Sequence, residues 1–309
     1  MIQGIGTIDI QFLANLQTLN EQTEQTQEQI SSGKTINQPS DNPGELGDVL
    51  ELESELGNVN QVSQNLTQVT NQANTAETAL ENATTVLDQV NSLGEQGANS
   101  TTSASTRSAL SQQVEQALSE LVSISQTQYD GLYVFSGDNA TQPSYQLDLT
   151  SGNGVDQLNT AQATSLVQDA TGVTFSVSQT AQQIFDDRNP DGSYATDNIF
   201  AAVNNLRIAL ANNDQAGITN ALSSLQLGQS HLSESLQFYG GVQDQLQNAS
   251  DVASKFQLQY QTALSSETDT NMATAAVALT QEQTAMEAAL QSNASMPKTT
   301  LFDLIGTNG

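Results

Sequence analysis

The sequence predicts a mainly α-helical, elongated bundle with paired terminal helices forming a coiled coil and a small β-rich inserted domain. Three observations predict this fold class. Apolar residues recur at alternating spacings of three and four along most of the chain, which is typical of heptad seams. Aromatic residues make up only 5% of the chain and tryptophan is absent, which favours thin helical packing over one large core. From Tyr133 to Asp197 the heptads are replaced by short apolar runs flanked by Gly, Asn and Pro.

The charge balance excludes several kinds of partner. The 309 residues include 6 basic and 34 acidic side chains, for a formal net charge of −28. Such a surface repels phosphate, so neither nucleic acid nor an anionic membrane is expected to bind. The chain has no cysteine, which excludes disulfides and cysteine-based metal sites. No stretch resembles a membrane span, and the N-terminus lacks the pattern of a cleaved signal peptide, so we expect any export to proceed without one.

The first predicted helix begins near Thr7 and has an incomplete seam. Two of its six seam positions are threonine, so this seam alone would hold two isolated helices together only weakly. We therefore expect the segment to need a partner and to be disordered without one. The seam consists of Phe12, Leu16, Leu19, Thr23, Thr26 and Ile30.

A break separates this helix from the next. Gly33 is expected to end the first helix, and Pro39 and Pro43 prevent helix formation after it, because each lacks an N–H and restricts the preceding residue. A second helix is predicted from about Glu45 to Leu93, ended by the glycines and polar residues that follow. Its seam runs without a miss through Val59, Val62, Leu66, Val69, Ala73, Ala76, Leu80, Ala83, Leu87 and Val90.

A third helix should lie antiparallel to the second, because the connection between them is short. Its seam is Leu110, Val114, Ala117, Leu121, Ile124 and Gln128. After it, the strand signals YVF, SYQLDL and VTFSVS indicate the β-rich insertion, and a short helix is expected near residues 161–168.

Helices resume at Ile199 with a short segment and then a long one. The long one keeps its heptad frame from Ile218 to Leu264, and Gly240–Gly241 inside it favours a bend, since glycine is costly in a helix. A last helix ends at Pro297, before an apolar tail. Its predicted seam is Met272, Ala276, Leu279, Gln283, Met286, Leu290 and Asn293.

These segments predict three domains. Residues 1–40 and 268–309 would form a terminal coiled-coil assembly domain, residues 41–132 and 199–267 a helical bundle, and residues 133–198 an outer β-rich insertion. The terminal seams are poorly filled and lie at chain ends, so we expect them to mediate assembly. The candidate assembly residues are Phe12, Leu16, Leu19, Ile30, Leu279, Met286, Leu290, Leu301 and Phe302.

One loop is a weak candidate for calcium. Asp187, Asn189 and Asp191 match the first half of an EF-hand loop. The twelfth position is Asn198 instead of a bidentate glutamate, and Pro190 interrupts the loop. A plain turn is therefore the favoured interpretation.

Catalytic chemistry has little support in the sequence. His231 is the only histidine, so a zinc or Ser/His site would be hard to build, and we expect a surface histidine beside the seam. Glu51, Glu53 and Glu55 are alternate residues that spread around a helix instead of converging. We expect neither an enzyme nor a cofactor.

Several motifs resemble the flagellin superfamily. Gln29–Gly33 (QISSG), then Ile36–Asn37 and Ser40–Asp41, are similar to its N-terminal block. DVLELESEL and YDGLYVFSGDNATQPSY, with the FSG motif at Phe135–Gly137, are most similar to the hook–filament junction proteins of that superfamily. LSSETDTNMATAAVALTQEQTAMEAAL resembles its C-terminal helix block. The resemblance covers about residues 5–60, 105–145 and 199–305, and the β-rich insertion matches poorly.

The resemblance implies a fold and a role. The fold would have an inner, tube-lining pair of terminal helices, an outer helical bundle and an exterior β lobe. The role would be a ring of subunits that joins the hook to the filament, beside the hook-associated protein FlgK and flagellin. Export would pass through the flagellar type III channel with the chaperone FlgN. Pro297, where relatives continue the terminal helix, and the shortage of Lys and Arg depart from the pattern.

Two other functions stay open. A filament flagellin would share the terminal blocks, although the FSG motif and the LELESEL segment favour a junction protein. A surface adhesin would use the β lobe to bind carbohydrate, with Tyr145, Phe175 and Tyr194 as the available aromatic rings. Glycan binding by residues 137–197 would support the adhesin.

Overall fold

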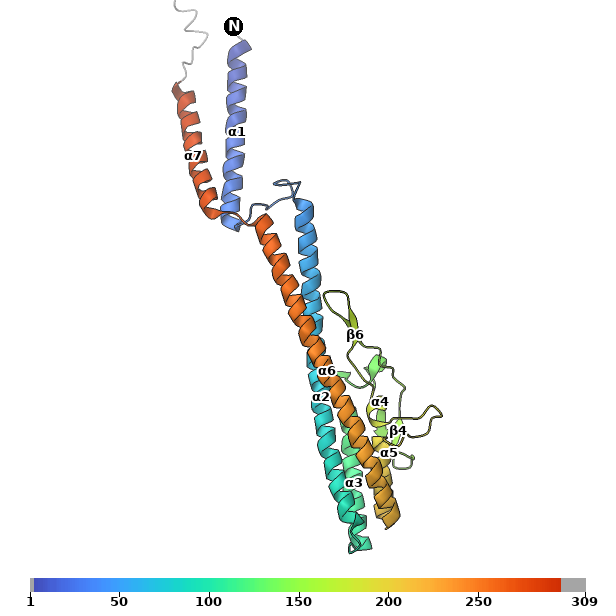
Figure 1. Ribbon diagram of the computed structural model, residues 1–309. Helices are drawn as coiled ribbons and strands as arrows, with labels where there is room; N and C mark the ends of the chain where they lie inside the picture. The colour runs from blue at the N-terminus through green and yellow to red at the C-terminus, as the bar shows by residue number, and fades with distance from the viewer. Residues whose placement is uncertain (1–2, 296–309) are drawn as a thin grey trace, which may run out of the picture. The chain divides into compact units, whose positions relative to one another are not determined.

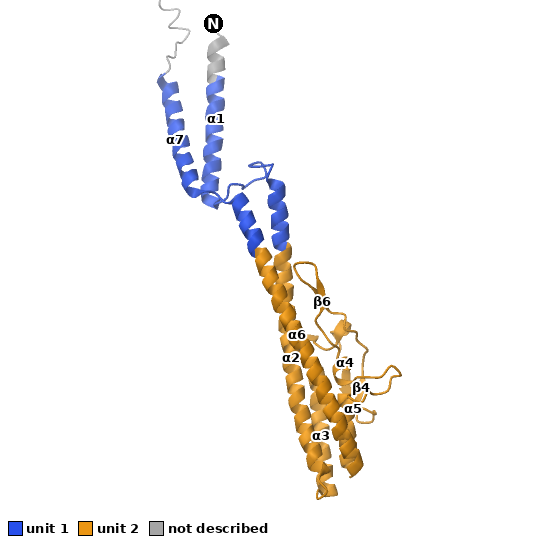
Figure 2. Ribbon diagram, viewed as in Figure 1, with its two compact units in different colours: residues 1–57, 258–309 blue, residues 58–257 orange. Residues whose placement is uncertain are grey.

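The computed structural model describes residues 3–295, with side chains from Ile10 onward, and divides the chain into two compact units (Figure 2). Unit 1 comprises residues 1–57 and 258–309, and unit 2 comprises residues 58–257. The two longest helices, α2 (Leu46–Ala98) and α6 (Gln215–Thr268), each contribute residues to both units. The expected mainly helical fold with a small β-rich part is confirmed. No helix in residues 3–295 has the length and apolar character needed to cross a membrane.

Unit 1 contains the two terminal helices. Helix α1 (Gln3–Ser32) and helix α7 (Met272–Ser295) lie side by side and run in opposite directions (Figure 1). The first turns of α2 and the last turns of α6 complete the unit.

Unit 2 is a helical bundle with a β lobe on one side (Figure 1). The bundle consists of α2, α3 (Ala104–Ser125), α5 (Ile199–Ala211) and α6. Every residue predicted for the seams of α2 and α6 is buried or half-buried, so both heptad frames are confirmed. Helix α6 is unbroken through Gly240–Gly241.

The predicted end of the second helix was wrong, because α2 continues through both glycines to Ala98. The glycines allow close packing instead. A Cβ atom on Gly94 would lie 2.6 Å from Leu222 Cδ2, and one on Gly97 would lie 2.2 Å from Leu210 Cδ2. A Cβ atom at either position would force the facing leucine side chain to shift, so the glycines allow the leucines to pack closely against the helix backbone.

Arg107 joins three helix ends in unit 2. Its side chain is buried, and its Nε donates to Gly97 O at 2.7 Å while Nη2 donates to Asn99 O at 3.1 Å. Nη1 donates to Asn213 Oδ1 at 2.6 Å, and Nη2 also bonds Gln215 at the start of α6. A cation at the C-terminal end of α2 satisfies carbonyls that the helix leaves unpaired.

The β lobe holds three two-stranded antiparallel sheets, the 3₁₀ helix η1 (Gly137–Asn139) and the short α-helix α4 (Ala181–Phe185). The predicted helix near residues 161–168 was wrong, because strand β5 ends this segment and the rest is loop. Residues 166–168 pair instead with residues 174–176, across the short turn between them. The sheets are β1 (Gln128–Tyr129) with β2 (Leu132–Tyr133), β3 (Tyr145–Leu147) with β4 (Val155–Gln157), and β5 (Leu166–Gln168) with β6 (Thr174–Ser176).

The FSG motif anchors the lobe to the bundle. Phe135 is fully buried and meets the rings of Phe185 and Tyr239 edge to face, at centroid distances of 6.0 and 6.4 Å. Ser136 Oγ donates to Gln142 O at 3.0 Å. Gly137 has a φ of +51°, and a Cβ atom there would lie 2.2 Å from a backbone oxygen, so only glycine fits.

A buried polar network fills the centre of the lobe around Asp186, which has no exposed surface. Its carboxylate accepts hydrogen bonds from Tyr145 Oη at 3.0 Å, Asn153 Nδ2 at 2.8 Å and Asn198 Nδ2 at 2.9 Å. Arg188 Nη2 completes the set at 2.7 Å. The charge is thus both paired and hydrogen-bonded, as a buried carboxylate requires.

Two buried tyrosines should make unit 2 less stable in alkali. Burial raises the pKa of Tyr239 to about 12, and burial together with the adjacent Asp186 carboxylate raises the pKa of Tyr145 further. The folded state therefore keeps both protons above the ordinary value of 10.0, where the unfolded chain releases them. The free energy of unfolding should fall by about 1 kcal/mol per tyrosine between pH ~10 and pH ~11.

Urea unfolding at about pH 9, 10 and 11 measures this loss, with tyrosinate absorbance reporting ionisation. Tyr239→Phe is the comparator, because its hydroxyl only accepts a 3.3 Å bond from Gln179 N. This variant should lose about half of the alkaline decrease. An identical decrease in the variant would contradict the assignment.

Candidate assembly surface on the terminal helices

The predicted seam of α1 faces α7. All six seam residues are half-buried or buried, and Thr26 is the most enclosed, with 8% of its surface exposed. The residues between them on α1 are mostly exposed. The hydrophobic pattern thus places Phe12, Leu16, Leu19 and Ile30 on the paired face of the helix.

The predicted seam of α7 faces α1 only in part. Leu279, Met286 and Asn293 are half-buried, whereas Met272 and Leu290 are 49% and 52% exposed. Ala276 and Gln283 are also exposed. The paired face instead includes the small or polar residues Ala275, Ala278, Glu282 and Ala289. Apolar spacing could not reveal this face, because alanine is a weak hydrophobic signal and Glu282 is charged.

Large apolar side chains on both terminal helices remain uncovered within one copy of the chain. Ile10 and Leu13 on α1 are 68% and 63% exposed, and Val277 on α7 is 57% exposed. Together with Met272 and Leu290, they add apolar surface beside the helix pair. These side chains are free within one copy to contact another chain.

The break between α1 and α2 is hydrogen-bonded to the connection between α6 and α7. Thr35 N donates to Thr268 O at 2.6 Å, and Thr270 N donates to Gly33 O at 2.9 Å. Asp41 Oδ2 accepts from the backbone N–H groups of Asn37 and Gln38, both at 2.8 Å. Two connections far apart in sequence therefore hold the ends of α1 and α7 together. Sequence reasoning missed this contact, because it is made by backbone groups.

Two of the predicted assembly residues, Leu301 and Phe302, lie outside the described residues. Pro297 lies outside them as well.

The calcium candidate forms a turn. Asp191 Oδ1 accepts from Ser193 N at 3.0 Å, and Asn189 Nδ2 donates to Ser193 Oγ at 2.9 Å. Arg188 and Tyr194 pair across the turn as an isolated antiparallel bridge. Among the described residues, no group of three or more His, Cys, Asp or Glu side chains is arranged to hold a metal ion.

His231 is half-buried on α6, where other segments of unit 2 pack against that helix. Its Nε2 lies 2.7 Å from Gln183 O, and its Nδ1 lies 3.5 Å from Asp197 Oδ2. The ring thus connects α6 with α4 and with the segment that precedes α5. The glutamates Glu51, Glu53 and Glu55 do not converge, since Glu51 and Glu53 are exposed and Glu55 is half-buried.

The aromatic rings of the lobe form no open platform. Tyr145 is fully buried, and Phe175 is half-buried. The Arg188 guanidinium lies over the Tyr194 ring, 5.3 Å from its centroid. A sugar would therefore meet no free face on Tyr145, and on Tyr194 it would compete with Arg188.

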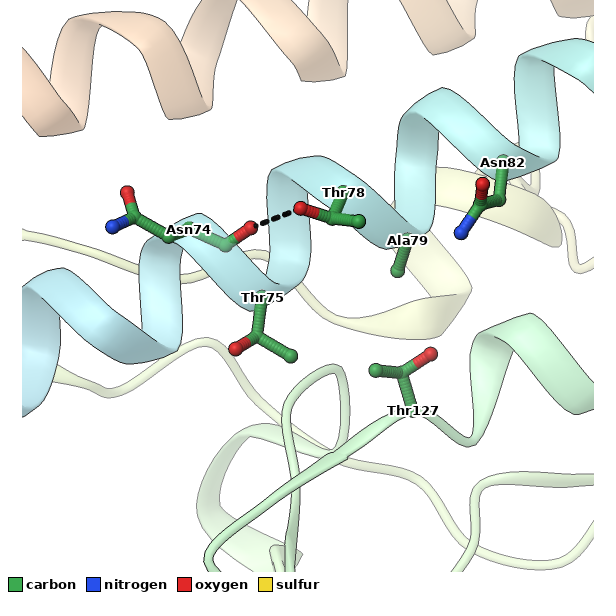
Figure 3. A pocket seen from close by; sticks show the side chains of 6 residues that line it. All are labelled: Asn74, Thr75, Thr78, Ala79, Asn82 and Thr127. Atoms are coloured by element: carbon green, nitrogen blue, oxygen red, sulfur yellow. Dashed lines mark hydrogen bonds between the residues drawn. The ribbon is translucent and has the colours of Figure 1, made fainter.

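A shallow pocket of about 310 Å³ lies on unit 2 and has no titratable side chain in its lining (Figure 3). Thr78 Oγ1 donates to Asn74 O at 2.9 Å, and Thr75 Oγ1 donates to Asn71 O at 2.8 Å, so these hydroxyls are satisfied by their own helix. The lining of the pocket consists of threonine, asparagine and alanine. It is lined by Asn74, Thr75, Thr78, Ala79, Asn82 and Thr127.

Part of the sequence is similar to bacterial flagellins. Residues 7–140 match the family model of the bacterial flagellin N-terminal helical region. The flagellar filament 41 kDa core protein of Borreliella burgdorferi is 30% identical over 118 residues, which are 38% of this chain and 35% of that protein. The match thus spans about a third of that relative's length.

Solved structures share the fold over a longer stretch. The flagellar hook-associated protein-3 from Legionella pneumophila matches 71% of this chain and 98% of its own length, with a TM-score of 0.59 and 13% identity. FlgL from Bacillus cereus matches 70% of this chain and 99% of its own length, with a TM-score of 0.56 and 14% identity. Residues 7–140 are therefore similar to the N-terminal helical region of bacterial flagellin, and the chain has the fold of the solved flagellar hook-associated proteins.

Proposed function

We propose that this chain is a structural, non-enzymatic subunit of the bacterial flagellum that forms the junction between hook and filament. The carrying observation is the fold match, which covers nearly all of the solved hook-associated proteins and about seven tenths of this chain. The flagellin match at residues 7–140 supports the same assignment from sequence.

The terminal helices support assembly through contacts between copies. Their shared seam is diluted by Thr23 and Thr26 on α1 and by alanines on α7, so the pair buries little apolar surface by itself. Exposed apolar residues such as Ile10, Leu13 and Val277 would be covered by neighbouring copies. The free energy of these contacts would offset the entropy lost when the helices become ordered.

The expected partners follow from this role. The subunit would contact further copies of itself in a ring or helical array, the hook-associated protein FlgK on one side and flagellin on the other. Export through the flagellar type III channel, guided by the chaperone FlgN, would deliver it to the cell exterior. The acidic chain would bind neither nucleic acid nor membrane.

A filament flagellin is the second candidate, because the curated relative from Borreliella burgdorferi is a filament core protein. Deleting the gene separates the two functions. Loss of a junction subunit should leave intact hooks without filaments and release flagellin into the medium. Loss of a filament subunit should leave no flagellin in the medium, and antibodies against the chain would then label wild-type filaments along their length.

Leu16→Asp combined with Leu19→Asp is expected to block incorporation into the flagellum. Both leucines lie half-buried on the α1 seam, and two carboxylates there would weaken helix pairing by several kcal/mol, or about three orders of magnitude in affinity. Swimming motility and immunolabelling of hook tips in a complemented deletion strain measure the effect.

Gln17→Asp combined with Asn20→Asp is the matched control, since it adds the same charges on exposed positions of the same helix. The control should incorporate normally, and both variants should keep the thermal unfolding transition of unit 2. Equal loss of motility in both variants would show that the added charge alone blocks incorporation, and it would contradict a role for the α1 seam.

A further inference from the structure

The seam between α1 and α7 contains a buried polar contact. Thr26 Oγ1 donates to Glu282 Oε1 at 3.0 Å, and Thr26 is 8% exposed. The other carboxylate oxygen, Glu282 Oε2, is buried and has no hydrogen-bond partner among the described residues. An acidic side chain thus lies in a helix interface with one of its two oxygens unsatisfied.

Nothing in the described part of unit 1 neutralises this carboxylate. Lys34 is the one basic residue in residues 3–57 and 258–295, and no ion pair joins it to Glu282. A buried acceptor without a donor weakens packing compared with an apolar residue of the same size. The contact therefore lowers the strength of helix pairing, so any benefit that it brings must lie elsewhere than in stability.

We propose that Thr26 and Glu282 set the register of α1 against α7. Moving one helix by seven residues would place Glu282 opposite Leu19 and Thr26 opposite Ala275, which removes the only donor that the carboxylate has in the described residues. The rest of the seam discriminates poorly between registers, because threonine and alanine interrupt its leucines. A single buried polar contact can fix register in a coiled coil for this reason.

The register is a property of the ordered α1–α7 pair and holds whether or not the chain is a flagellar subunit. Neither the apolar pattern nor the resemblance indicated a role in specificity for Thr26 and Glu282.

Engineered cysteine pairs can report the register directly, because the chain itself contains no cysteine that could form another disulfide. Leu19→Cys with Ala289→Cys lies seven residues from the polar contact on each antiparallel helix, so it reports the observed register. Phe12→Cys with Ala289→Cys reports the register displaced by seven residues. Disulfide formation within one chain in a glutathione buffer gives the effective concentration of each pair, measured at a chain concentration at which circular dichroism shows the terminal helices to be ordered.

The observed-register pair should form at least about tenfold more readily than the displaced pair in the parent chain. Adding Thr26→Val with Glu282→Met should bring the two pairs close to equal while keeping or increasing their combined yield. Thr26→Val alone should lower the yield of the observed-register pair and leave the displaced pair unchanged, because Glu282 already lacks the Thr26 donor in the displaced register.

Thr23→Val is the matched control. Its hydroxyl, one turn away on the same seam, donates to Leu19 O of its own helix at 2.8 Å, so its removal should leave the ratio unchanged. Three results would overturn the proposal: equal yields in the parent chain, no disulfide from either pair, or an unchanged ratio in the double variant.

Discussion

Replacing Leu66 and Leu80 together by aspartate is expected to unfold unit 2. Both leucines lie in the α2 seam, with 1% and 0% of their surface exposed. Truncating a buried leucine costs about 2–5 kcal/mol, and a carboxylate in the same place adds the penalty of burying a charge. The sum for two sites approaches or exceeds the whole stability of a typical domain, about 5–15 kcal/mol.

Circular dichroism during heating measures this loss. The double variant should lose its cooperative transition and most of its helical signal at room temperature. Gln64→Asp with Asn82→Asp is the matched control, because both residues are exposed on the same helix and the added charge is equal. A cooperative melt in the Leu66/Leu80 variant close to that of the control would show that α2 is not central to the bundle.

Asp186→Ala is expected to open the β lobe while the helical bundle persists. The substitution leaves the Arg188 guanidinium and the Asn153 amide without this acceptor, and Tyr145 loses its partner as well. Asn198 keeps only its bond to Asp187 O. Removing one partner of a buried charge pair costs about 3–5 kcal/mol. The lobe is built from two- and three-residue strands that cannot compensate for such a loss.

Limited proteolysis measures the opening, with cleavage expected first within residues 137–197. Asp187→Ala is the control, because the backbone carbonyl of Asp187 makes its contact to Asn198 at 2.8 Å and alanine retains it. Asp186→Asn should fall between the two, since an amide keeps one acceptor oxygen. Similar cleavage rates for Asp186→Ala and Asp187→Ala would contradict a central role for the network.

The helical seams of α1, α2 and α6 could be predicted because helix periodicity is a local property. Residues three and four apart share a face in any α-helix, so spacing alone identified Leu66, Leu80 and Leu87 as buried. The FSG motif was also found from sequence. Its reason, a buried Phe135 beside a Gly137 that accommodates a backbone oxygen, required the fold.

The face of α7 that meets α1 could not be predicted in full. Its leucine and methionine residues predicted one stripe, but close helix approach favours small residues, and Ala275 and Ala289 lie at the contact while Leu290 is exposed. Gly94 and Gly97 led to the wrong predicted end of α2 for a similar reason. A glycine in a helical pattern predicts a helix end, and only the fold shows the leucines that pack against it.

The sequence by itself determined that the chain is mainly helical, that it is strongly acidic, and that its terminal seams are incomplete, because composition and periodicity are properties of neighbouring residues. Tertiary structure alone decided which polar groups meet across long sequence separations, such as Asp186 with Asn153 and Thr26 with Glu282. These contacts join residues up to 256 positions apart. Only the folded chain brings such donors and acceptors within hydrogen-bond distance, so no local pattern records them.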